Sequence, residues 1–85
     1  DDREKFEIIK KVVKNQKMAN KDFIDIDGIR VNDNGGWWLL RASNTQPAIV
    51  ARCESSTIEG LRIQKENVKN ELSLVKSSLA DKIFS

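Results

Sequence analysis

The chain has 85 residues, of which 15 are Lys or Arg and 13 are Asp or Glu, so its formal net charge is only +2. This length fits one small domain with a modest core, and the near balance of charge argues against a large polyanion-binding surface. No apolar run approaches membrane-spanning length, and no signal-peptide apolar region is present. We therefore expect a protein of the cytoplasm that does not contact membranes.

The residue types also exclude several chemistries. The sequence contains no histidine, so a His general acid or base and a Ser-His or Cys-His pair are excluded. Its single cysteine, Cys53, allows no internal disulfide and no set of thiolate metal ligands. Cys53 falls in an apolar segment, where a free cysteine usually behaves as a small buried hydrophobe.

The first predicted element is an amphipathic helix over residues 3–15. Lysines separate apolar residues that recur at helical spacing, and we interpret the basic excess as a solvated face. The apolar positions are Phe6, Ile8, Ile9, Val12 and Val13. A polar linker over residues 15–21 is expected to follow.

A β-hairpin is predicted next, because Asp27-Gly28 between two alternating apolar segments is a strong signal for a two-residue turn. That turn sets a register in which Ile24 faces Val31 and Asp25 pairs with Arg30. The apolar side chains then share one face of the hairpin: Ile24, Ile26, Ile29 and Val31.

Two further strands are predicted over residues 37–41 and 48–54, after a second turn at residues 33–36 whose Asn and Gly residues suit positive φ. Side chains alternate along a strand, so Trp37 and Trp38 point to opposite faces. We expect one tryptophan in the core. The other is expected to cover the outer sheet face, although a docking surface for another domain is an alternative.

A long final helix completes the predicted fold. Ser56 and Glu59 have the spacing of a capping box at its start. Its apolar positions are Ile58, Leu61, Val68, Leu72, Val75 and Leu79. The predicted fold class is α+β, in the order α-β-β-β-β-α, with a four-stranded antiparallel sheet and two helices on one face.

The most informative segment is the loop of residues 41–47 between the last two strands. Arg41, Ser43, Asn44 and Thr45 all carry hydrogen-bond donors, and no acidic side chain occurs from residue 35 to residue 53. These side chains, with backbone N–H groups, could surround a phosphate dianion. The alternative is an ordinary turn, because Ser, Asn and Thr are common turn residues and a strand-end Arg can lie over a sheet.

Several segments resemble the C-terminal domain of the α-D-phosphohexomutases, within that family most closely the bacterial phosphomannomutase/phosphoglucomutase branch. They are residues 27–31, residues 36–47 and Arg52, and the similarity extends over about residues 22–59. The Arg-x-Ser-Asn-Thr-x-Pro loop after a Gly-Trp strand is its most specific part. One departure is Gln46, where relatives often have Glu.

The resemblance implies a TATA-binding-protein-like fold and a single domain, residues 1–85, at the C-terminal end of a larger enzyme. Position by position, it implies that Arg41, Ser43, Asn44 and Thr45 bind the phosphate of the sugar that is not reacting. Arg52 would give electrostatic support from the neighbouring strand. The domain would also close the active-site cleft over the substrate.

The resemblance also implies what lies elsewhere in the enzyme. The family's catalytic serine motif and aspartate-rich magnesium loop do not occur in this sequence, so no catalytic or metal residue is assigned and the fragment alone is expected to be inactive. The full enzyme would interconvert hexose 1-phosphate and hexose 6-phosphate, with Mg²⁺ and a hexose 1,6-bisphosphate activator. Its partners would be a phosphosugar and three other domains.

A small nucleic-acid-binding module is the alternative function, because an antiparallel sheet with an exposed tryptophan and arginines could stack and neutralise a single strand. The few aromatic residues and the acidic segment of residues 22–34 argue against it, so we predict no nucleic-acid partner. A purely structural interaction domain is a third possibility.

Overall fold

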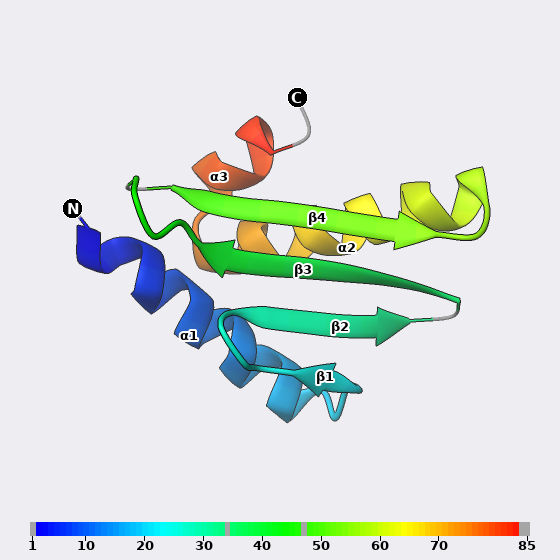
Figure 1. Ribbon diagram of the computed structural model, residues 1–85, viewed down its shortest axis with the longest axis horizontal. Coiled ribbons are helices and arrows are strands. Elements are labelled where there is room, and N and C mark those ends of the chain that lie inside the picture. The colour runs from blue at the N-terminus through cyan, green and yellow to red at the C-terminus, as the bar shows by residue number, and fades with distance from the viewer. Residues whose placement is uncertain (1, 34, 47, 84–85) are drawn as a thin grey trace.

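The protein is an antiparallel sheet covered on one side by helices (Figure 1). The computed structural model describes residues 2–33, 35–46 and 48–83. Over these residues the elements are α1 (Asp2–Met18), β1 (Phe23–Ile24), β2 (Ile29–Asp33), β3 (Gly36–Ala42), β4 (Ile49–Ser55), α2 (Ile58–Val75) and α3 (Ser77–Lys82). The described strands form one four-stranded sheet in the order β1-β2-β3-β4, with every neighbouring pair antiparallel. The predicted fold class and element order are confirmed.

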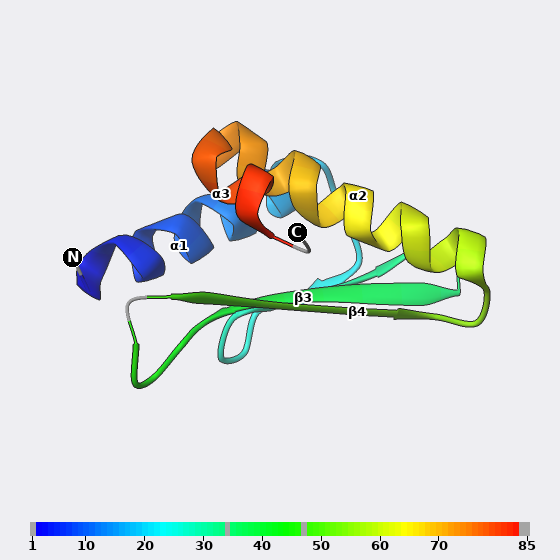
Figure 2. The same cartoon turned by 90° about the horizontal axis from the view of Figure 1, so that it is seen from above.

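All the described helices lie on one side of the sheet, and the opposite sheet face is left uncovered (Figure 2). Helix α1 contacts β2 and β3, whereas α2 contacts β3 and β4. The two long helices therefore share one sheet face, with β3 beneath both. This arrangement leaves the side chains of the outer face free to meet a ligand or another part of a larger protein.

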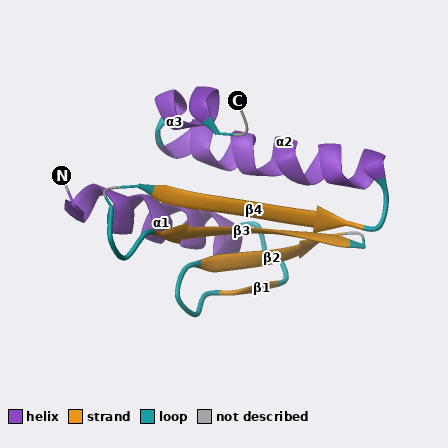
Figure 3. Cartoon of the chain, turned by 45° about the horizontal axis from the view of Figure 1, so that its top comes forward, coloured by secondary structure: helices purple, strands orange, loops and turns teal. Residues whose placement is uncertain are grey.

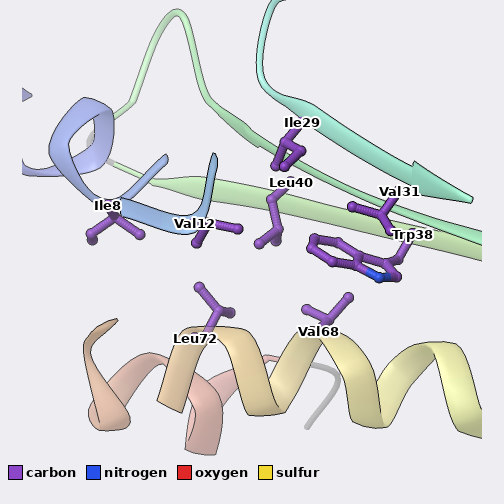
Figure 4. Packing of buried hydrophobic residues seen from close by; sticks show 8 residues of the cluster. All are labelled: Ile8, Val12, Ile29, Val31, Trp38, Leu40, Val68 and Leu72. Carbon is purple, nitrogen blue, oxygen red and sulfur yellow. The ribbon is translucent and has the colours of Figure 1, made fainter. Parts of the chain in front are cut away.

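The core lies between the helix layer and the inner face of β2 and β3 (Figure 4). The buried hydrophobic side chains are Ile8, Val12, Ile29, Val31, Trp38, Leu40, Val68 and Leu72. The two tryptophans point to opposite faces with one in the core, as predicted, and the structure shows that Trp38, with Leu40, is the inward one and Trp37 the outward one. Burial of each large apolar side chain stabilises the fold by about 1.5–3 kcal/mol, so this cluster is the main source of stability.

The first hairpin differs from the predicted register by one residue. Phe23 pairs with Val31 and Ile24 with Arg30, whereas a two-residue turn would pair Ile24 with Val31. Asp25 lies beyond the end of β1, in the connection to β2, and forms no ion pair with Arg30. The predicted pairing of these two side chains is therefore wrong.

A one-residue shift of register moves the side chains of a strand to the other face, and this explains the observed burial. Ile29 and Val31 are buried as predicted, but Ile24 and Ile26 are 51% and 83% exposed. Phe23 packs against the core in their place. The connection contains two residues with positive φ, Asp27 at 56° and Gly28 at 116°.

The second turn is confirmed: Asp33 pairs with Gly36, and Gly35 has a φ of 82°. Asn34 lies outside the described residues. The start of the final helix differs from the prediction, because the N-cap is Thr57, whose hydroxyl accepts the Gly60 N–H at 2.9 Å. The proposed capping box one residue earlier is wrong.

The final helix is also split into two. Lys76 takes an extended conformation, so α2 ends at Val75 and α3 begins at Ser77. Serine side chains compete for backbone hydrogen bonds and weaken a helix, which accounts for a break beside Ser77 and Ser78. The break lets Leu79 of α3 pack against the core, and Lys76 forms an ion pair with Glu4 of α1.

Candidate functional site

The candidate loop joins β3 to β4 at one end of the sheet, beside the N-terminal end of α1 (Figure 3). Strand pairing continues to Ala42 and Ile49. The Ser43 N–H then donates to the Ala48 carbonyl at 2.9 Å, and the Ala48 N–H donates to the Gln46 carbonyl at 2.8 Å. The loop therefore continues the hairpin as a closed turn. Pro47 lies outside the described residues.

The Ser43 side chain organises the interior of this turn. Its hydroxyl oxygen accepts the N–H groups of Thr45 and Gln46, at 3.3 and 3.2 Å. These two amides therefore point inward, whereas the sequence analysis allowed the loop amides in general to surround a ligand. In the described part of the loop, the backbone N–H of Asn44 is the only one without an acceptor. The Ser43 hydroxyl hydrogen is still available for donation, because its oxygen serves as the acceptor in these contacts.

The other predicted ligands are accessible to solvent. Arg41, Asn44 and Thr45 are exposed, and Ser43 is half-buried. Arg41 lies near the end of β3, paired with Val50 of β4, and forms no ion pair with any carboxylate in the described part of the chain. The structure thus gathers the four predicted residues within one strand end and one turn, with their donors unsaturated.

Arg52 lies on the same outer sheet face as Arg41. It is paired across the sheet with Leu39, two residues before Arg41, and Leu39 is paired on its other side with Arg30. Sequence analysis missed Arg30 as a member of this group, because the predicted register gave it Asp25 as a cross-strand partner. Its guanidinium instead lies 4.4 Å from the Trp37 ring centroid, a cation–π contact. The uncovered face therefore carries three arginines.

Lys5 of α1 is the second residue that sequence analysis missed. Its ammonium donates to the Ser43 carbonyl at 2.6 Å and to the Gln46 carbonyl at 2.9 Å, and the residue is only 8% exposed. The signal was present in the helical spacing, since Lys5, Ile8 and Val12 fall on one stripe of α1 and all three are buried. The lysines of this helix had been interpreted together as a solvated face.

A neighbouring loop supports the end of β3 from the side. Gly28 lies so close to this strand that a Cβ there would be 2.5 Å from the Leu40 carbonyl oxygen and 2.8 Å from the Arg41 Cβ. A surface pocket of about 280 Å³ lies beside the candidate loop, with Phe6 of α1, Gly28 and Asn44 among its lining residues. Gly28, which directly precedes β2, and the candidate loop therefore line the same surface pocket.

The described residues offer few other chemical sites. No three His, Cys, Asp or Glu side chains among them lie close enough together to hold a metal ion. Burial raises the pKa of the Cys53 thiol, which favours its neutral form. None of the helices in the described ranges is both long and apolar enough to cross a membrane.

Comparison with known proteins identifies relatives of this chain. A family model described as the phosphoglucomutase/phosphomannomutase C-terminal domain matches residues 1–71. A phosphomannomutase/phosphoglucomutase from Pseudomonas aeruginosa is 40% identical over 75 residues, which are 88% of this chain and 16% of that protein. A phosphoglucomutase from Neisseria meningitidis is 48% identical over 46 residues, 53% of this chain and 10% of that protein. A probable phosphoglucosamine mutase from Pyrococcus furiosus is 36% identical over 64 residues, which are 75% of this chain and 14% of that protein.

Proposed function

Because this chain belongs to the phosphoglucomutase/phosphomannomutase C-terminal domain family, we propose that its loop of residues 41–46 binds a phosphate group of a hexose phosphate. The chain spans 16% of the length of the P. aeruginosa relative, so the activity of a whole enzyme is part of the proposal. In it, this domain serves a phosphohexomutase that interconverts hexose 1-phosphate and hexose 6-phosphate. The domain itself supplies substrate binding and no reacting group.

The observation that carries the proposal is the unpaired Arg41 beside a turn with unsaturated donors. An Arg guanidinium presents parallel N–H groups that match two phosphate oxygens, and such charge-assisted bonds are stronger than neutral ones. The Ser43 and Thr45 hydroxyls and the amide groups of Asn44 can reach the remaining oxygens. Arg52, on the same face, adds positive potential. Together these groups provide charge and hydrogen bonds, and the loop sequence itself contains no Asp or Glu that would repel the ligand.

The proposed ligand is the phosphate that does not react in a given half of the cycle. A phosphohexomutase moves a phosphoryl group between two ends of a sugar, so a bisphosphorylated intermediate must be held in either orientation. A loop that recognises phosphate and makes no demand on the sugar suits this requirement. The relatives fit this view, because their names include phosphomannomutase, phosphoglucomutase and phosphoglucosamine mutase.

The remaining chemistry is assigned to other domains of the proposed enzyme. The described residues provide no cluster of carboxylates suited to Mg²⁺, which prefers oxygen ligands in octahedral geometry. As part of the proposal, Mg²⁺, the phosphorylated serine and the site of the hexose 1,6-bisphosphate activator lie in the three other domains of that enzyme. Cytoplasmic location is part of the same proposal, since hexose phosphates are intracellular metabolites.

Closure of the active site is the second part of the proposed role. A domain that carries a phosphate-binding loop can move onto the bound sugar and exclude water. Small-angle scattering of the enzyme with and without hexose 1,6-bisphosphate should then show a smaller radius of gyration in the bound state. An unchanged scattering profile at saturating ligand would contradict closure without contradicting phosphate binding.

Phosphate binding itself is tested by titrating the ¹⁵N-labelled 85-residue chain with inorganic phosphate. We expect weak, saturable shifts at the amides of residues 43–46, with a dissociation constant on the order of millimolar, because one exposed site lacks enclosing walls. Arg41→Ala should abolish these shifts. The matched control is Arg62→Ala, which removes an exposed arginine from α2 and should leave them intact. Equal shifts in all three proteins would refute the proposal, and saturable binding of single-stranded RNA instead would favour the nucleic-acid alternative.

A further inference from the structure

Lys5 joins α1 to the candidate loop through two hydrogen bonds that cross 38 and 41 residues of sequence. Its ammonium donates to the carbonyls of Ser43 and Gln46, which flank the tip of the loop. These two hydrogen bonds connect the described turn to the helix layer. The other hydrogen bonds of the turn run between its own residues, from 43 to 48. The position of α1 therefore determines the position of the turn.

The charge of Lys5 is unusual for a residue with this burial. A lysine residue that is only 8% exposed normally has a carboxylate partner, because burial of an uncompensated charge is costly. Lys5 has no ion pair with any carboxylate whose side chain the structure describes. Two carbonyl dipoles compensate it only in part, and the Phe6 ring centroid lies 5.2 Å away. Among the described side chains, the positive charge beneath the loop therefore has no carboxylate partner.

The Ser43 carbonyl belongs to the same peptide group as the Asn44 N–H. The described residues contain no cis peptide bond, so this N–H points away from the carbonyl and hence away from Lys5. It is also the one described loop amide without an acceptor. A hydrogen bond to the carbonyl polarises the peptide group and strengthens its N–H as a donor. Lys5 therefore turns the Asn44 amide outward and increases its attraction for an anion.

We propose that Lys5 is a positioning residue for phosphate, which fixes the Ser43–Asn44 peptide with its N–H toward the ligand and supplies a second positive charge behind the loop. This inference rests on the proposed function and adds a residue outside the 41–52 segment to it. The lysine does not touch the phosphate. It acts through the turn, and its charge complements that of Arg41 on the other side of the loop.

The test uses the phosphohexomutase that carries this domain, with glucose 1-phosphate as substrate. Lys5→Met keeps the apolar stem and removes the charge and donors. We expect the KM to rise by about tenfold with a smaller change in kcat, since a charged hydrogen bond acts mainly on phosphate binding. Lys5→Arg should recover part of the affinity. Lys11→Met, an exposed lysine on the same helix, is the control and should leave the KM unchanged.

Hydrogen exchange without substrate provides a readout that is independent of phosphate. The amides of Thr45 and Gln46, which donate to the Ser43 hydroxyl oxygen, should exchange faster in Lys5→Met than in the parent and in Lys11→Met. The melting temperature should change little, because removal of a poorly compensated buried charge offsets the lost bonds. If Lys5→Met fails to fold, Lys5→Gln, which retains a donor without the charge, replaces it and should show the same rise in KM.

The outcomes separate this inference from the proposed function. Parental KM and parental loop exchange in Lys5→Met would overturn the role of Lys5, even where Arg41→Ala weakens substrate binding. If the KM rises only where the melting temperature also falls, and Lys5→Arg does not restore the KM, Lys5 is purely structural. That result would also overturn its role as a positioning residue. If Arg41→Ala leaves the KM unchanged while Lys5→Met loosens the loop, the phosphate site itself is refuted.

Discussion

Gly28 couples the fold to the candidate site, so its replacement by Ala is expected to disturb both. Its φ of +116° lies in a region that side chains rarely adopt, and this strain costs about 1–3 kcal/mol. The new Cβ would also lie 2.5 Å from the Leu40 carbonyl oxygen, in the backbone of β3. Because backbone must shift to relieve this overlap, we add roughly 1–3 kcal/mol by analogy with an overpacked core. The two contributions together give an expected loss of unfolding free energy of about 2–6 kcal/mol.

Gly35→Ala is the matched control for this prediction. Gly35 also has positive φ, at +82°, but the nearest atom to a new Cβ is the Ser56 hydroxyl oxygen at 3.9 Å. This variant should therefore lose only the strain contribution, about 1 kcal/mol. Urea denaturation of the parent and both variants, analysed with a common slope, gives the comparison. A Gly28→Ala loss no larger than that of Gly35→Ala would refute the argument from close packing.

Two further variants probe the core and one half-buried carboxyl, and one experiment tests the isolated chain. Leu72→Ala should lose about 2–5 kcal/mol because the side chain is fully buried, whereas Leu74→Ala, on a residue that is 73% exposed, should lose under about 0.5 kcal/mol in the same urea titration. Burial raises the pKa of Glu71 above its ordinary value of 4.5, against a hydrogen bond from Gln16 that lowers it. The folded state then binds the proton more tightly, so parental stability falls as pH rises from the unfolded pKa through the folded pKa. Glu71→Gln should remove this loss and stabilise the protein near neutral pH, with no gain below about pH 4; equal pH profiles would contradict the prediction. The 85-residue chain alone should show no mutase activity in a coupled assay with glucose 1-phosphate and Mg²⁺, and any turnover would contradict its assignment as a binding domain.

The sequence predicted those features that depend on neighbouring residues. The alternation of Trp37 and Trp38 and the turn at Gly35 follow from strand geometry and local backbone preference. The register of the first hairpin does not, because it depends on how Gly28 packs against the Leu40 carbonyl. A local turn signal carries no information on that distant contact, and a one-residue error placed Ile24 on the wrong face.

In the candidate site, too, the residues close together in sequence could be predicted, whereas those brought together by the fold could not. The ligands proposed at Arg41 to Thr45 are contiguous in sequence and could be identified together. The helical spacing of Lys5 with Ile8 and Val12 signals its burial, but its acceptors could not be predicted, because they lie 38 and 41 residues away. Arg30 was missed for a related reason, since its contact with Trp37 requires the pairing of β2 with β3.

The most direct test of the phosphate site is a paired measurement of kinetics and thermal melting on Arg41→Ala in the phosphohexomutase that carries this domain. Removal of a charge-assisted bond of roughly 1.5–3 kcal/mol should lower kcat/KM by about one to two orders of magnitude. Arg41→Lys should recover only part of this, because an ammonium lacks the planar fork. The exposed strand-end position predicts an unchanged melting temperature, as for the control Arg62→Ala. Full activity in Arg41→Ala, or a fall in melting temperature large enough to explain the lost activity, would contradict the assignment of Arg41 as a phosphate ligand.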